Sequence, residues 1–102
     1  MGLDISLVKK EYLVDMNITH NLVPMWKKAG IYDALYNSEG IEAKEILPIL
    51  IDGLEDMIKN KKEYEELNSP NGWGLYMNAV PWLIELIKGC KDNPDGIIEV
   101  SK

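Results

Sequence analysis

The chain has 102 residues, of which 46% are apolar, and its formal net charge is −6. This length fits a single domain over residues 1–102, with none left for a second one. Its eleven cationic side chains are all lysines, and so acidic a chain without arginine argues against binding polymeric DNA or RNA, which needs dense positive charge.

The cysteine content and the hydropathy of the chain indicate where the protein acts. Cys90 has no partner for an intramolecular disulfide, which fits a reducing cytoplasm. No apolar run approaches the roughly eighteen residues of a membrane span, and the first residues lack the basic and apolar regions of a signal peptide. We therefore expect a cytoplasmic protein with no membrane partner. A domain this small buries a modest core, so we also expect a homo-oligomer, a dimer or a tetramer.

Two short segments near the ends of the chain predict strands. Residues 11–16 read Glu-Tyr-Leu-Val-Asp-Met, and residues 96–101 read Gly-Ile-Ile-Glu-Val-Ser. Because the termini of small domains often lie close together, we expect these strands to pair. The predicted fold class is α+β and predominantly α-helical: a compact helical domain with a small two-stranded sheet formed by N- and C-terminal strands.

The residues between these strands predict helices. Apolar spacing, caps and turn residues mark five segments, at residues 20–28, 32–36, 43–60, 63–67 and 74–91. The clearest pattern is in residues 43–60, where Ile46, Leu50 and Leu54 recur at helical spacing. Pro48 and Pro81 fall inside two of these segments, and the sequence leaves open whether they bend the helices or divide them.

The segment Asn17-Ile18-Thr19-His20-Asn21 precedes the first predicted helix and contains the only histidine. One interpretation is that His20 donates a hydrogen bond to a phosphate or a base, with Thr19 and Asn21 beside it and the backbone N–H groups of a helix start nearby. The other is that these side chains only cap the helix and tie it to the strand before it.

The segment Asn71-Gly72-Trp73-Gly74 precedes the last predicted helix. The glycines would let a flat group approach the indole of Trp73, and stacking on such a ring stabilises a bound base by roughly 1–3 kcal/mol. Asn71 and Tyr76 would complete this side of a site. The alternative is that Asn71-Gly72 forms a turn and Trp73 plugs the core beneath it.

Few other residues suggest chemistry. Most lysines are expected to be solvated, but Lys28 lies two turns beyond His20 and could reach a ligand shared with a neighbouring subunit. The acidic pairs Glu42/Glu45 and Glu55/Asp56 read as solvated helix faces. The chain has no metal-binding motif, nucleophile elbow or glycine-rich phosphate loop, so we expect no metal, no cofactor and no catalysis.

The order of these segments resembles a widespread family of small proteins of phages and bacteria, with Ile-Thr-His-Asn and Asn-Gly-Trp-Gly as its motifs. The resemblance covers nearly the whole chain and is carried by Ile18-Thr19-His20-Asn21-Leu22, Ala29-Gly30-Ile31-Tyr32, Ala34-Leu35-Tyr36, Ile46-Leu47-Pro48, Asn71-Gly72-Trp73-Gly74, Tyr76, Cys90, Pro94-Asp95 and Ser101. The chain departs from the family pattern at Pro81, where an apolar residue other than proline is expected, and at Tyr36, where Trp is more usual.

We identify this family with the phage-encoded anti-CBASS sponges, which hold the cyclic nucleotide signals of a bacterial antiviral system and keep its effector switched off. The resemblance implies a mainly helical protomer, a homo-oligomer, and ligand sites near subunit contacts without turnover. A cyclic dinucleotide offers two charges and two flat bases. Thr19, His20, Asn21 and Lys28 could hold the phosphates, and Tyr32, Trp73 and Tyr76 could hold the bases.

Two other functions fit the same sequence. An acidic phage inhibitor, anti-CRISPR-like or of another anti-defence kind, would act through protein–protein contacts, and it predicts Asp and Glu side chains gathered on one face. A nucleotide-degrading enzyme would use His20 as its general acid or base, although the chain offers little catalytic chemistry around it.

Overall fold

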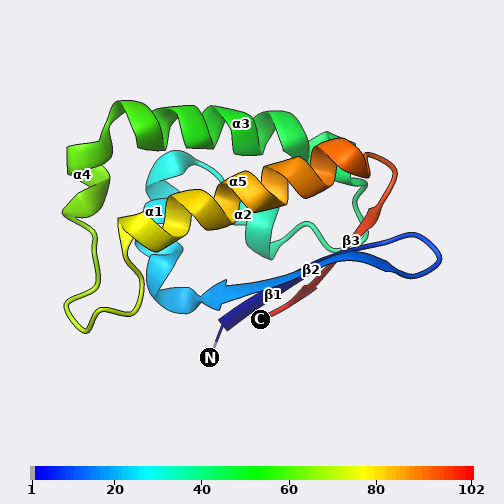
Figure 1. The fold of residues 1–102 in the computed structure, drawn as a ribbon, viewed down its shortest axis with the longest axis horizontal. Helices are drawn as coiled ribbons and strands as arrows, with labels where there is room; N and C mark the ends of the chain where they lie inside the picture. The colour runs from blue at the N-terminus through cyan, green and yellow to red at the C-terminus, as the bar shows by residue number, and fades with distance from the viewer. Residues whose placement is uncertain (1) are drawn as a thin grey trace.

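The computed structural model describes residues 2–102, and its centre is an antiparallel sheet of three strands. The strands are β1 (Gly2–Val8), β2 (Tyr12–Thr19) and β3 (Ile97–Ser101), in the order β2-β1-β3. All the described helices lie on one side of this sheet, and the beginning of β1 lies close to the end of β3 (Figure 1). The predicted fold class, α+β with helices dominant and a small sheet of N- and C-terminal strands, is confirmed.

The predicted pairing of the two terminal strands is wrong, because β1 lies between them. Asp4 of β1 faces Asn17 of β2 on one side and Ser101 of β3 on the other. The signal for β1 is present in the sequence as alternation: Leu3, Ile5 and Leu7 are buried, while Asp4 and Ser6 point to the opposite face. A third strand therefore joins the two that the sequence predicts.

The predicted helices are present, and the bounds of the last two are shifted by two residues at their starts. They are η1 (His20–Leu22), α1 (Val23–Ala29), α2 (Tyr32–Tyr36), α3 (Ala43–Lys59), α4 (Lys61–Glu65) and α5 (Tyr76–Asp92). The first predicted helix is a 3-10 turn followed by a short α-helix. The last begins two residues later than predicted because Gly74 has a φ of 112°, outside the helical region.

Neither internal proline divides its helix. Pro48 and Pro81 are each the sixth residue of a helix of 17 residues, and both helices continue through them. The missing N–H of each proline would have paired with the carbonyl of the second helical residue, so each helix loses one hydrogen bond near its N-terminal end. Both prolines are exposed, so their rings do not displace core side chains.

The core lies between the inner face of the sheet and the helices. Leu3, Ile5 and Leu7 of β1 contribute fully buried side chains from below, and α3 and α5 pack side by side above them (Figure 1). No helix of the part of the chain that the structure describes covers the opposite face of the sheet (Figure 1). Within residues 2–102 no helix is long and apolar enough to cross a membrane.

The close packing of α3 on the segment before α2 depends on Gly53. A Cβ atom at this position would overlap the Cγ2 atom of Ile31 and would lie 3.2 Å from the carbonyl oxygen of Ala29. Replacing glycine by alanine inside a helix normally stabilises it by about 1 kcal/mol. At Gly53 the steric overlap outweighs this gain, so the same replacement is expected to destabilise the protein.

We predict that Gly53→Ala lowers the free energy of unfolding by about 1–3 kcal/mol, because Ile31 and the backbone of Ala29 must move to admit the methyl group. Urea denaturation of the variant measures this loss. Asp52→Ala is the matched control: it changes the neighbouring exposed helical position and should leave stability the same or slightly higher. A stabilised Gly53→Ala variant would contradict this packing.

Candidate functional site

The end of β2 and the loop before α5 meet in space. A Cβ atom at Gly74 would lie 2.7 Å from the Cβ atom of Asn21, so only glycine fits where the loop crosses the start of η1. Gly74 also has the positive φ that favours glycine. The two polar segments singled out in the sequence are therefore neighbours in the fold.

These segments border a hollow of about 600 Å³ at one end of the sheet, which we call the Trp73 hollow. It is lined by Gly2, Asp4, Asn17, Ile18, Thr19, His20, Asn21 and Trp73. A second hollow, of about 430 Å³, lies on another side of the Trp73 ring and includes Gly72, Gly74 and Asn78. Trp73 lines both hollows and is 70% exposed, so it is not a plug in the core.

Trp73 is held in this exposed position by the loop around it. The Oδ1 atom of Asn71 accepts hydrogen bonds from the backbone N–H of Trp73 at 2.9 Å and from Ser69 Oγ at 2.7 Å. This is the local arrangement by which an asparagine side chain stabilises a turn. Asn71 therefore positions the indole and is not among the residues that line either hollow.

His20 is anchored at one ring nitrogen and open at the other. Its Nδ1 atom lies 2.9 Å from the hydroxyl of Tyr36, whose ring stacks on Tyr32 at a centroid distance of 4.7 Å. Burial raises the pKa of Tyr36 to about 12, so its hydroxyl stays protonated at neutral pH. Among the described residues nothing bonds His20 Nε2, which serves as a donor or an acceptor according to the tautomer.

Other polar side chains in the hollow are also available to a ligand. Within residues 2–102, the carboxylate of Asp4 and the side-chain amides of Asn17 and Asn21 make no hydrogen bond or ion pair with the protein. The sequence interpretation missed Asp4, and it included Asn17 in the segment before the first helix without naming it as a ligand residue. The alternation of β1, read with its pairing to β2, places both on the uncovered sheet face.

Besides Asn71, three more predicted ligand residues lie outside the Trp73 hollow. Lys28 pairs with Glu63 at 3.4 Å, and Tyr32 belongs to the stack behind His20. Tyr76 is buried and donates its hydroxyl to the carbonyl oxygen of Met57 at 2.9 Å. The hollow thus combines Thr19, His20, Asn21 and Trp73 with two residues that were not predicted as ligand residues, Asp4 and Asn17.

Three backbone N–H groups of the two segments are engaged within the protein and are not free to bind a phosphate. The backbone N–H of Asn21 donates to Thr19 Oγ1, that of Trp73 to Asn71 Oδ1, and that of Tyr76 to Asn68 Oδ1. No lysine lines the Trp73 hollow, and Asp4 places a negative charge in its wall. The hollow therefore suits the flat and polar parts of a ligand better than its anionic parts.

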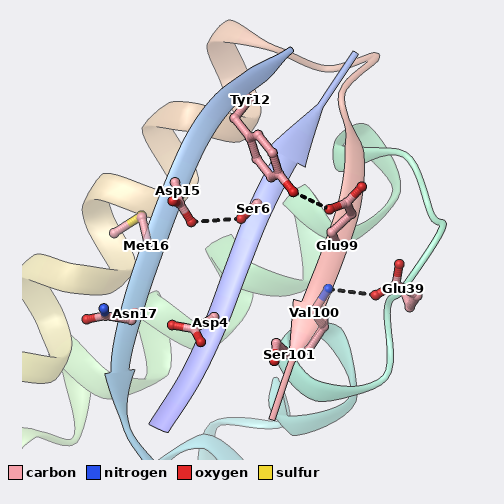
Figure 2. A pocket seen from close by; sticks show the side chains of 10 residues that line it. All are labelled: Asp4, Ser6, Tyr12, Asp15, Met16, Asn17, Glu39, Glu99, Val100 and Ser101. Carbon is pink, nitrogen blue, oxygen red and sulfur yellow. Dashed lines mark hydrogen bonds between the residues drawn. The ribbon is translucent and has the colours of Figure 1, made fainter. Parts of the chain in front are cut away.

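Next to the Trp73 hollow, the uncovered face of the sheet holds another hollow, of about 490 Å³, which is acidic (Figure 2). We call it the acidic sheet face and define it by four carboxylates, on Asp4, Asp15, Glu39 and Glu99. No lysine is among the residues that line it. Because Asp4 and Asn17 line both hollows, the two form one continuous surface.

Hydrogen bonds order the side chains of the acidic sheet face. Asp15 accepts from Ser6 Oγ at 2.9 Å, and Glu99 accepts from the hydroxyl of Tyr12 at 3.0 Å, as Figure 2 shows. The bond to Glu99 raises the pKa of Tyr12, because ionising the phenol would place two negative charges together. Tyr12 is 64% exposed, so this face presents an ordered aromatic ring beside its carboxylates.

The described residues offer little for catalysis. Burial raises the pKa of the Cys90 thiol to about 11, so it is a protonated core residue and not a nucleophile. No group of three or more His, Cys, Asp or Glu side chains in residues 2–102 is arranged to hold a metal ion. Comparison with known proteins found no matching family model, no similar curated protein and no similar solved structure, so the sponge family stays a prediction.

We predict that Tyr36→Phe lowers the free energy of unfolding by about 1–2 kcal/mol, because it leaves the part-buried His20 Nδ1 without its partner. Urea denaturation measures the change. Tyr32→Phe is the matched control, since it keeps the stack and removes a hydroxyl that bonds nothing among the described residues. Equal losses in both variants would show that the bond between His20 and Tyr36 does not stabilise the site.

Proposed function

We propose that this protein binds a cyclic (oligo)nucleotide immune signal and sequesters it without cleaving it, as a phage immune-evasion protein of the anti-CBASS sponge kind in the bacterial cytoplasm. The observation that carries the proposal is that His20 and Trp73, from distant parts of the chain, border one open hollow. The resemblance of the sequence to the sponges supplies the class of ligand.

In this proposal the Trp73 hollow binds a base. An exposed indole is a stacking platform, and asparagine, histidine and threonine side chains can pair with the polar edge of a base. Asp4 keeps the phosphates out of the hollow, so they extend toward solvent at its rim. The hollow is open on one side, and a homo-oligomer, dimer or tetramer, would place several such hollows around one cyclic ligand.

Sequestration needs no reactive group, only abundance and an affinity above that of the host receptor. The one cysteine is buried and protonated, and His20 has Tyr36 as its partner in place of a carboxylate or a nucleophile. These features support binding over turnover at this surface.

We predict that a cyclic di- or trinucleotide raises the melting temperature of the protein and is released intact when the complex is heated. Trp73→Ala should weaken binding about tenfold or more, because it removes the stacking surface. Met77→Ala is the matched control, since Met77 is equally exposed and lines neither hollow beside Trp73. Thermal melting and chromatography of the released ligand provide the measurements.

Three results of that experiment would contradict sequestration. A cleaved product would identify an enzyme. Unchanged affinity in both Trp73→Ala and His20→Ala would place the ligand elsewhere on the protein. No shift with any cyclic nucleotide would exclude the tested signals and favour the second function described next.

The acidic sheet face supports a second candidate function, an acidic phage inhibitor, anti-CRISPR-like or of another anti-defence kind, that covers a basic surface of a host protein. The specific observation is the uncovered face with four carboxylates and no lysine, bordered by the exposed ring of Tyr12. Interfaces favour aromatic anchors, and complementary charge accelerates association.

For this second function we predict binding to a lysine-rich peptide that weakens at least tenfold between about 50 and 300 mM salt, because screening removes the attraction. The variant Asp15→Asn, Glu39→Gln, Glu99→Gln should lose most of this binding in calorimetry. The variant Glu45→Gln, Asp52→Asn, Glu55→Gln neutralises three exposed carboxylates of α3 and should lose much less. Equal losses in the two variants would show only a general effect of net charge.

A further inference from the structure

We propose that the Trp73 hollow selects guanine, and that Asp4 reads the guanine edge by accepting hydrogen bonds from its N1–H and its 2-amino group. This inference rests on the proposed binding of a cyclic nucleotide. It goes beyond that proposal by naming the base and the residue that distinguishes it.

Asp4 is fixed in place by the strand that carries it. Leu3 and Ile5 on either side are fully buried, so the Asp4 side chain must point to the uncovered face. There it stands between Asn17 of β2 and Ser101 of β3, and it lines the hollow beside Trp73. Figure 2 shows its carboxylate on β1 turned toward β2, the strand that carries Asn17.

Among the described residues that line the hollow, Asp4 carries the only carboxylate, and none is a lysine. An ionised carboxylate can only accept hydrogen bonds, and no described residue donates one to Asp4. A ligand that brings donors to this point gains charge-assisted bonds, whereas one that brings an acceptor meets repulsion between lone pairs.

The Watson–Crick edges of the bases differ in this respect. Guanine presents two adjacent donors, N1–H and the 2-amino group, which match the two oxygens of a carboxylate. Adenine and cytosine each place a ring-nitrogen acceptor beside one amino group, and uracil has a single N–H between two carbonyl oxygens. The O6 atom of guanine needs a donor beside Asp4, and the free amides of Asn17 and Asn21 can supply one.

The negative charge of Asp4 affects both the affinity for cyclic nucleotides and the preference among their bases. Asp4 repels the phosphates of every cyclic nucleotide alike, so it lowers all absolute affinities while raising the preference among bases. Discrimination that works partly by rejecting the wrong partner is a general route to specificity. Removing the charge should therefore improve binding of an adenine ligand and abolish the preference for guanine.

The test compares cyclic di-GMP, cyclic di-IMP and cyclic di-AMP by calorimetry with the full chain. We expect the guanine ligand to bind roughly ten to a hundred times more tightly than the adenine ligand, which is the range for bonds to a charged group. The hypoxanthine ligand, which keeps N1–H and lacks the 2-amino group, should fall between them. Asp4→Asn should bring the guanine-to-adenine ratio close to one.

The control is Glu11→Gln, which removes the same charge from an exposed position that lines neither the Trp73 hollow nor the acidic sheet face. It should keep the preference of the unmodified chain. Circular dichroism of Asp4→Asn checks that the exposed substitution leaves the fold intact.

The outcomes separate this inference from the function beneath it. If the adenine ligand binds as tightly as the guanine ligand, or if Asp4→Asn keeps the preference, the reading of guanine by Asp4 is wrong while sequestration stands. If none of the three ligands binds, both the inference and the cyclic dinucleotide proposal fail. A ratio that collapses in Asp4→Asn alone supports the proposal.

Discussion

The structure depends on the position of β1 at the centre of the sheet. Both other strands pair with it and not with each other, so its seven residues fix the register of the whole sheet. The alternating side chains of β1 also distinguish the face of the sheet that packs against the helices from the uncovered face. Leu3, Ile5 and Leu7 enter the core, while the side chains of Asp4 and Ser6 point to the opposite face, where Asp4 is exposed and Ser6 is covered by its neighbours. A slip of one residue in β1 would exchange these sets and place a carboxylate in the core.

This constraint explains why the candidate site is where it is. The inner face of the sheet is used entirely by packing against the helices, so the outer face is free to carry polar side chains. At one end of that face β2 turns into η1, and the loop that bears Trp73 crosses it at Gly74. The site is therefore built from one strand edge, one helix start and one loop, each held by a different part of the core.

The sequence predicted α3 and α5 because the apolar spacing of these two helices of 17 residues is long and regular, and caps and turn residues marked the shorter ones. It also singled out the His20 and Trp73 segments, since polar residues and glycines at predicted helix starts are unusual enough to notice. The sequence did not predict the roles of side chains whose hydrogen-bond or ion-pair partners lie far away in the chain. Nothing in the local sequence shows that Lys28 pairs with Glu63 or that the Tyr76 hydroxyl reaches Met57, because these partners are distant in the chain. Asp4 was missed because the strand that orients it was missed.

Asp4 also links the two surfaces described above. It lines both the Trp73 hollow and the acidic sheet face, so its charge acts on whatever occupies either one. A cationic group placed against the acidic face would reduce the negative potential at the neighbouring hollow and so weaken the repulsion of phosphates there. By the reciprocity of linked equilibria, an anionic ligand in the hollow would favour that cation to the same extent. The two candidate functions would therefore be coupled through one carboxylate. They would differ in the sign of their salt dependence. Screening would relieve the repulsion of phosphates by Asp4, but it would remove the attraction of a basic partner.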